Sequence, residues 1–156
     1  MRWIHLTASC ICGAAVAAGC NLGPEPPRNF SVVEPVLAEG DLAPILKAEA
    51  AKAHAMGRKP FVELEASWCG PCKALKRSLD DPLMQQAFSG TYIIQIDVDQ
   101  WESQLRSAGF TIESFPVFHE INSEGKPTGR SIDGGAWEEN IPANMAPPLQ
   151  KFFNGE

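Results

Sequence analysis

The stretch WCGPCK, residues 68–73, follows directly on a strand-like segment, residues 61–66, and opens a predicted helix. At a helix start, Cys69 lies beside unpaired backbone N–H groups and the positive end of the helix dipole, which stabilise a thiolate. Pro71 suits the first turn, where its missing N–H costs nothing. Cys72, one turn further, is less exposed and close enough to attack a mixed disulfide held on Cys69. The spacing predicts a redox-active pair whose leading sulfur is ionised and open to incoming proteins.

Two other uses of a CxxC pair are a zinc site and a purely structural disulfide. A structural zinc site takes four ligands, usually as two such pairs, and the chain has no second CxxC. The two histidines outside the N-terminal segment, His54 and His119, have no paired spacing. A disulfide between residues three apart would restrain little chain entropy. We therefore expect thiol–disulfide catalysis and no metal.

Length, composition and charge exclude several classes of protein. The chain has 156 residues, of which 44% are hydrophobic and 21% charged. These values are typical of a soluble domain and exclude a wholly disordered, collagen-like or multi-span membrane chain. The formal net charge of −6 argues against nucleic acid as a partner, because phosphate binding needs a basic surface.

Residues 1–19 have the composition of a secretory signal peptide. Arg2 supplies a positive start, and residues 4–18 contain no charged side chain. The apolar run is shorter than the roughly 20 residues that a membrane-spanning helix needs. We therefore expect export and cleavage, with an uncleaved anchor as the alternative.

The end of this segment, VAAGC at residues 16–20, resembles the lipobox of bacterial lipoproteins, where cleavage precedes a cysteine that then carries lipid. The resemblance implies lipidation of Cys20 and localisation to the periplasm or cell envelope. Asn21, by similarity to Gram-negative lipoproteins, implies anchoring in the outer membrane. Ordinary signal-peptidase cleavage in the same zone is the alternative. Cys10 and Cys12 would leave with the signal peptide.

Residues 20–40 contain four prolines and predict an extended, semi-rigid tether between the lipid anchor and the folded body. As an alternative for part of this segment, residues 30–33 join the body as an edge strand. The folded domain is expected to cover residues 41–156.

The body of the chain alternates helical and strand-like patterns in the order α, β, α, β, α, β, β, α. The first helix begins at Asp41 as N-cap and ends at Gly57. The last helix lies within residues 137–153 and is expected to be interrupted by its prolines, Pro142, Pro147 and Pro148. Between them we expect strands at residues 61–66, 92–98, 116–121 and 128–132, and helices at residues 70–79, 81–88 and 101–108.

WCGPCK after a strand is similar to the active-site motif of the thioredoxin family, and the similarity runs from about Lys59 to Phe153. The resemblance implies the thioredoxin fold, an α/β fold with a central mixed β-sheet flanked by helices. Asp97-Val-Asp resembles the central strand of that family, and the glycine pair 134–135 resembles a family glycine that lets substrate approach. The resemblance covers most of the predicted domain.

Two further positions carry roles that the resemblance implies. Glu63, six residues before Cys69, takes the place of the family's buried acid and would accept the Cys72 proton as that thiol attacks. Ser114-Phe115-Pro116 resembles the loop whose cis-proline faces the CxxC pair. The alternatives are a solvated strand residue for Glu63 and an ordinary strand-start proline for Pro116.

The same resemblance implies a substrate-binding surface around the cysteines. Trp68 flanks the site and offers apolar surface to partners, beside Gly70 and Pro71 of the motif. The backbone of Phe115 is expected to pair with an extended substrate segment. The lysines that follow Cys72 on the helix, Lys73 and Lys76, are expected to solvate its surface, with added positive potential near Cys69 as the alternative.

Departures from the family pattern bear on mechanism and branch. Glu65 stands where thioredoxins commonly have an aromatic residue, and Gln95 replaces the lysine that usually partners the buried acid. Residues 78–88 are closer to the periplasmic thioredoxin-like domains of disulfide-interchange proteins than to cytoplasmic thioredoxin. The dipeptide Gly70-Pro71 resembles reducing members rather than strong oxidants.

Together these resemblances imply a secreted thiol–disulfide oxidoreductase that works as a reductase and uses the Cys69–Cys72 disulfide without another cofactor. Its partners would be protein thiols and disulfides, with electrons from a membrane donor such as a disulfide-interchange reductase. One alternative is a thioredoxin of cytochrome c maturation. The other is a non-catalytic thioredoxin-fold module that binds a partner and keeps a structural disulfide.

Overall fold

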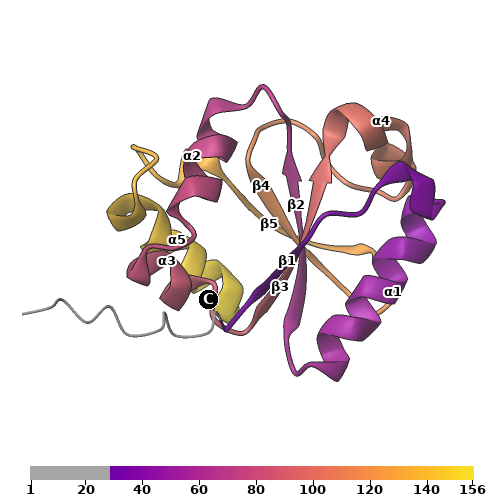
Figure 1. Ribbon diagram of the computed structural model, residues 1–156, viewed down its shortest axis with the longest axis horizontal. Coiled ribbons are helices and arrows are strands. Elements are labelled where there is room, and N and C mark those ends of the chain that lie inside the picture. The colour runs from indigo at the N-terminus through magenta and orange to yellow at the C-terminus, as the bar shows by residue number, and fades with distance from the viewer. Residues whose placement is uncertain (1–28) are drawn as a thin grey trace, which may run out of the picture.

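A computed structural model describes residues 29–156 of the protein, and its centre is a five-stranded mixed sheet (Figure 1). The strand order across the sheet is β1-β3-β2-β4-β5. Strands β1, β3 and β2 are parallel, whereas β4 runs antiparallel to both β2 and β5. The strands are β1 (Ser31–Val33), β2 (Lys59–Glu65), β3 (Thr91–Asp97), β4 (Val117–Ile121) and β5 (Pro127–Asp133). This arrangement confirms the expected α/β fold.

Helices cover both faces of this sheet. In Figure 1, α2, α3 and α5 lie on one side of the strands, and α1 and α4 lie on the other. The helices are α1 (Leu42–Ala55), α2 (Gly70–Ser78), α3 (Pro82–Ala87), α4 (Val98–Ser107) and α5 (Pro142–Asn154), with 3-10 turns η1 (Leu37–Glu39) and η2 (Gly134–Ala136). No helix within residues 29–156 is long and apolar enough to cross a bilayer.

Each face of the sheet has its own hydrophobic core because side chains alternate along a strand. On β2, Val62 and Leu64 pack into the core beneath α1 and α4, whereas Phe61 packs into the core beneath α2, α3 and α5. Val62 and Leu64 therefore share one face of the strand, and Phe61 lies on the other. The alternation also puts Glu63 on the Phe61 face, toward the helix that carries the cysteines.

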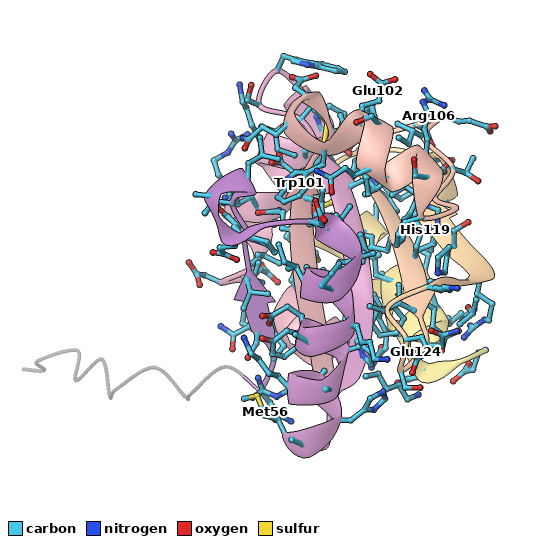
Figure 2. The ribbon with its side chains drawn as sticks, turned by 90° about the vertical axis from the view of Figure 1, so that its right-hand side faces the viewer. Met56, Trp101, Glu102, Arg106, His119 and Glu124 are labelled. Carbon is cyan, nitrogen blue, oxygen red and sulfur yellow. A yellow bond between two sulfur atoms is a disulfide. The ribbon has the colours of Figure 1, made fainter. Side chains whose placement is uncertain are left out.

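The core under α1 and α4 includes one large aromatic residue. Trp101 points from α4 into the protein and is buried, whereas Glu102 and Arg106 point outward (Figure 2) and form an ion pair of 2.9 Å. Helix α4 begins at Val98, three residues before the predicted start, because the Asp97 side chain accepts a hydrogen bond from the Asp99 backbone N–H and caps the helix.

The N-terminal part of the described chain belongs to the folded body. Residues 31–33 pair with residues 92–94 of β3, and the buried ring of Phe30 lies 5.4 Å from that of Phe88. The edge-strand alternative for residues 30–33 is therefore confirmed, and the folded body begins before residue 41. The rest of the predicted tether up to residue 28, with the predicted signal peptide and Cys20, lies outside the described residues.

Helix α5 differs from the expectation of an interrupted helix. Pro142 occupies its first turn, but Pro147 and Pro148 lie inside it and the helix continues to Asn154. Each internal proline costs about 3 kcal/mol. Each large side chain that the helix buries contributes about 1.5–3 kcal/mol. The combined burial energy of these side chains therefore outweighs the cost of the two prolines. The large buried side chains of α5 are Met145, Leu149, Phe152 and Phe153.

Helix α1 begins and ends close to the predicted positions, but its cap differs. Asp41 is the N-cap residue, yet its side chain accepts no capping hydrogen bond from the helix. The Leu42 backbone N–H instead donates to Oε1 of Gln104 on α4, at 2.7 Å. A side chain distant in sequence therefore serves the first turn of α1, which local sequence patterns do not predict.

Candidate active site

The two cysteines form a disulfide at the junction between β2 and α2. The Cys69–Cys72 S–S distance is 2.08 Å, and Cys69 is the N-cap residue of α2. Its Sγ accepts a hydrogen bond from the Cys72 backbone N–H, at 3.1 Å. A sulfur thus takes the place of a capping oxygen at the positive end of the helix, where a thiolate is stabilised once the bond is reduced. The predicted pairing and its position at the helix start are confirmed.

The exposure of the pair differs from the expectation. Cys69 is 5% exposed and Cys72 is 2% exposed. Cys72 is the less exposed of the two, as predicted, but Cys69 is buried and not open to incoming proteins. Both cysteines belong to the core beneath α1 and α4. The accessible surface at this point comes instead from neighbours in the motif, because Trp68 is 62% exposed and Gly70 and Pro71 are also exposed.

The loop that precedes β4 lies against this motif. The Phe115–Pro116 peptide bond is cis, which confirms what the family resemblance implies. Phe115 packs against the core cluster that includes both cysteines, and its ring meets that of Trp68 edge to face at a centroid distance of 5.8 Å. The structure therefore brings Trp68 and Phe115, which are 47 positions apart in the chain, into one surface beside the disulfide.

Asp133, at the end of β5, holds this loop in place. One carboxylate oxygen accepts from the Ser114 hydroxyl at 2.5 Å, and the other accepts from the Gly135 N–H at 2.9 Å. The preceding backbone N–H, that of Gly134, donates to the Pro116 carbonyl at 3.0 Å. Asp133 is absent from the residues predicted for the site, although Asp-Gly-Gly at residues 133–135 is typical of a turn in which the aspartate caps its own backbone.

Glu63 is buried, so the solvated alternative is wrong. It is 2% exposed, and its Oε2 accepts a hydrogen bond of 3.1 Å from Nε2 of Gln95. Its Oε1 has no hydrogen-bond partner among the described residues. Loss of hydration raises the pKa of Glu63 to about 8, and the Gln95 hydrogen bond only partly offsets this effect. A carboxyl group with such a pKa can both take up and release a proton near neutral pH.

Lys76 approaches the same acid through Gln95. Its Nζ donates to Oε1 of Gln95 at 3.3 Å and forms an ion pair of 2.5 Å with Glu34. The lysine lies on α2, one helical turn after Cys72. The helical pattern predicts that Lys76 solvates the helix surface and contains no signal for its contact with Gln95. Periodicity on α2 gives no information about which strand residue faces it.

Three carboxylates lie next to the motif, two at the ends of paired strands and one hydrogen-bonded to Trp68. Glu65 at the end of β2 is paired in register with Asp97 of β3, and burial followed by repulsion from Asp97 raises the pKa of Glu65. Asp99 accepts a hydrogen bond of 2.9 Å from Nε1 of Trp68. These groups make the potential near the cysteines more negative and oppose the effect of the helix dipole on a thiolate.

His119 lies on β4, away from the cysteine motif, and is buried. Its Nε2 is 3.2 Å from the Thr111 carbonyl, and burial lowers the pKa of the ring. Within residues 29–156, no group of three or more His, Cys, Asp or Glu side chains is placed to hold a metal ion.

Comparisons with known proteins agree on one family. The thioredoxin family model matches residues 47–147. A thioredoxin of Aspergillus fumigatus, Asp f 28, is 30% identical over 74 residues, which is 47% of this chain and 64% of that protein. The match thus spans less than two thirds of the length of this relative.

The chain is also similar to two solved structures. A disulphide isomerase from Xylella fastidiosa Temecula1 has a TM-score of 0.55 and 22% identity, over 78% of this chain and 95% of that chain. Trxlp from Edwardsiella tarda EIB202 has a TM-score of 0.48 and 24% identity, over 79% of this chain and 98% of that chain. The first of these likenesses shows that the two proteins share their fold.

Proposed function

Because this chain belongs to the thioredoxin family and carries the family's CxxC active site, we propose that it is an exported, lipid-anchored thiol–disulfide oxidoreductase that mainly reduces protein disulfides. One observation carries the proposal: the Cys69–Cys72 disulfide caps the N-terminus of α2, with the Cys72 N–H bonded to Cys69 Sγ. That position stabilises the thiolate on which disulfide exchange depends.

The reaction proceeds by two exchanges that together transfer two electrons to the substrate. The Cys69 thiolate of the reduced enzyme attacks one sulfur of a substrate disulfide, forms a mixed disulfide and releases the first substrate thiolate, which takes a proton. Cys72 then loses its proton and attacks Cys69 Sγ, which forms the Cys69–Cys72 disulfide and releases the second substrate thiolate. A dithiol donor restores the enzyme by the same exchanges in reverse.

Glu63 is the acceptor for the Cys72 proton in this scheme. It is buried on the face of β2 that looks toward α2, and its pKa of about 8 is close to the ordinary pKa of a thiol. Proton transfer between groups of similar pKa needs little driving force. Once Glu63 has accepted the proton it is a neutral carboxylic acid. Burial favours this neutral form over the charged carboxylate.

Substrates are proteins that present a disulfide in an extended segment. The exposed Trp68, Gly70 and Pro71 provide a surface around the buried sulfurs, and Phe115 continues it on the cis-proline loop. An extended segment can pair with the backbone at Phe115 and place its sulfur over Cys69. The hydrogen bonds of Asp133 to Ser114 and Gly135 keep this loop in one position for that contact.

The reducing direction follows from the charges around the disulfide. Strong oxidants owe their potential to a stabilised thiolate in the reduced form. Here Glu65 and Asp97 are paired at the ends of their strands, and Asp99 is bonded to Trp68; negative charge this close to the motif destabilises a thiolate, so the protein gives up electrons more readily. The Gly70-Pro71 dipeptide, which resembles that of reducing family members, supports the same direction.

We expect the Cys69–Cys72 couple to have a reduction potential near the value of about −270 mV of reducing thioredoxins, and not near the value of about −120 mV of strong oxidants. Equilibration in thiol–disulfide buffers followed by alkylation of free thiols measures it. Glu65→Gln should raise the potential, whereas Glu102→Gln on the outer surface of α4 should leave it unchanged. A native potential above about −150 mV would reverse the proposed direction.

Export and anchoring rest on the sequence of the N-terminal segment. Residues 1–19 have the composition of a signal peptide, and VAAGC at residues 16–20 resembles a lipobox. An anchor on Cys20 would hold the domain at the outer membrane, facing an oxidising compartment. Electrons must then come from a membrane protein that passes them across the membrane by thiol–disulfide exchange, such as a disulfide-interchange reductase.

We expect Cys20→Ser to move the protein from the membrane fraction to the soluble periplasmic fraction. A single lipid chain binds membranes only marginally, and the several chains of a lipoprotein bind them stably, so loss of the acceptor cysteine removes the attachment. Fractionation and metabolic labelling with a fatty acid measure the change. Cys12→Ser, within the predicted signal peptide, is the matched control and should keep the label. Unchanged fractionation of Cys20→Ser would refute the lipid anchor.

A further inference from the structure

Three side chains from different parts of the chain connect the surface to the buried acid Glu63. Glu34, just after β1, forms an ion pair of 2.5 Å with Lys76 of α2. Lys76 donates to Oε1 of Gln95 at 3.3 Å, and Nε2 of Gln95 donates to Oε2 of Glu63 at 3.1 Å. The path therefore begins at solvent and ends at a carboxyl group that is 2% exposed.

The chemistry of the groups gives this path a direction. An ammonium group only donates hydrogen bonds, so Lys76 can bind only the oxygen end of the Gln95 amide. The amide must then turn its NH2 end toward Glu63, where it favours the ionised carboxylate. Without Lys76, the buried amide is free to turn its oxygen toward Glu63 and to accept a proton from the neutral acid instead.

The contact matters because Glu63 has few partners. Its other oxygen, Oε1, makes no hydrogen bond to any residue in the range 29–156. Its register neighbours in the sheet are Gln95 on β3 and Phe118 on β4, and neither side chain carries a charge. The orientation of the single amide of Gln95 therefore has a large effect on the charge state of the acid.

We propose that Lys76 is a positioning residue for the active-site acid: it holds the Gln95 amide with its hydrogens toward Glu63 and brings a positive charge within two hydrogen bonds of this carboxyl group. The role of this acid in turnover rests on the function proposed above. The lysine that the family usually places at position 95 is thus replaced by a neutral amide on β3 and a lysine on α2.

Three charged groups affect the proton affinity of Glu63 from the elements packed around it. Lys76 of α2 lowers the pKa of Glu63, whereas Glu65 of the same strand and Glu34 of the segment after β1 raise it. Each of these effects is smaller than that of burial. Lys76 is the positive member of the set, so its removal is expected to shift the titration of Glu63 upward.

The test follows the carboxyl carbon of Glu63 by 13C NMR as the oxidised, full-length protein is titrated from pH 5 to pH 10. We expect Lys76→Met to raise the midpoint by about one pH unit, since the carboxylate loses both an oriented donor and a nearby charge. Arg77→Met removes a positive charge from the adjacent, exposed position of α2 and is the matched control. Its midpoint should stay within about 0.2 unit of the native one.

A double-mutant cycle with Gln95→Leu separates positioning from simple charge loss. If Lys76 acts through the amide, Lys76→Met should add little to the shift that Gln95→Leu already causes. Shifts that add in full, or a native midpoint in Lys76→Met, would overturn the proposal. Lys76→Arg, which keeps the donor and the charge, should restore most of the native midpoint.

Turnover provides an independent readout. In a single-turnover assay, the pH dependence of the step in which Cys72 resolves a mixed disulfide on Cys69 should move with the NMR midpoint in Lys76→Met. Midpoints that move as expected in a protein that does not exchange disulfides would support positioning by Lys76 and overturn the proposed function. Normal turnover with an unchanged midpoint in Lys76→Met would support the proposed function and overturn positioning by Lys76.

Discussion

We expect Cys69→Ser to abolish disulfide reduction, and Cys72→Ser to accumulate covalent mixed disulfides with its substrates. The reason is the division of labour at the start of α2. Cys69 caps the helix and accepts the Cys72 N–H, so its thiolate is the stabilised one, and Cys72 lies within the first turn where it can attack the sulfur of Cys69. Loss of the attacking nucleophile should lower the rate by about three orders of magnitude or more.

The measurement is reduction of a protein disulfide by the purified protein with an excess of a small dithiol, followed by non-reducing electrophoresis to detect mixed disulfides. Met56→Ser provides a matched control, because it removes an exposed sulfur-bearing side chain at the far end of α1 (Figure 2) and should leave the rate unchanged. Equal activity in the native protein and both cysteine variants would contradict catalysis. The non-catalytic binding module would then remain as the function of the fold.

The free energy of unfolding of the oxidised protein should fall as the pH rises from about 5 to about 8, and Glu63→Gln should remove most of this decrease. The pKa of Glu63 is raised from 4.5 to about 8 in the folded state, chiefly by burial. Between these values the folded state binds a proton that the unfolded state has released, so a rise in pH favours unfolding. The stabilisation is complete below about pH 4.5 and lost above about pH 8.

The size of the effect follows from the shift. One pKa unit corresponds to about 1.36 kcal/mol, so the native protein should lose about 3–5 kcal/mol of stability across this window. Urea unfolding at several pH values measures the decrease. Glu138→Gln, at an exposed position before α5, is the matched control and should retain the native pH dependence. A native protein whose stability is flat between pH 5 and pH 8 would show that Glu63 is ionised at neutral pH.

Features that depend on neighbours in the chain were predictable from the sequence. The CxxC pair at the start of α2 follows from Cys69, Pro71 and Cys72 alone, since proline in the first turn and a helix after a strand are local preferences. The two faces of β2 follow in the same way, because side chains alternate along any strand. The starts of α1 after Asp41 and of α3 after Asp81 follow for the same reason, and α1 ends at Ala55, two residues before the predicted Gly57.

Other features required the folded chain. The sequence predicts an interrupted last helix, but the burial of Met145, Leu149, Phe152 and Phe153 keeps α5 continuous across Pro147 and Pro148. It also predicts an open Cys69, but the disulfide belongs to the core beneath α1 and α4, and the exposed surface comes from Trp68 and its neighbours. In both cases the energy of packing against distant elements outweighs a local preference.

The sequence by itself determined the fold and the identity of the redox pair, because strand, turn and helix signals around residues 61–79 arise from backbone geometry and short-range hydrogen bonding. Only the tertiary structure decided which side chains serve this pair. Glu63, Gln95 and Lys76 come from β2, β3 and α2 and meet because strands 32 positions apart are paired in register. Contacts of this kind depend on how the helices pack against the sheet, and the hydrophobic periodicity of a single helix or strand does not predict them.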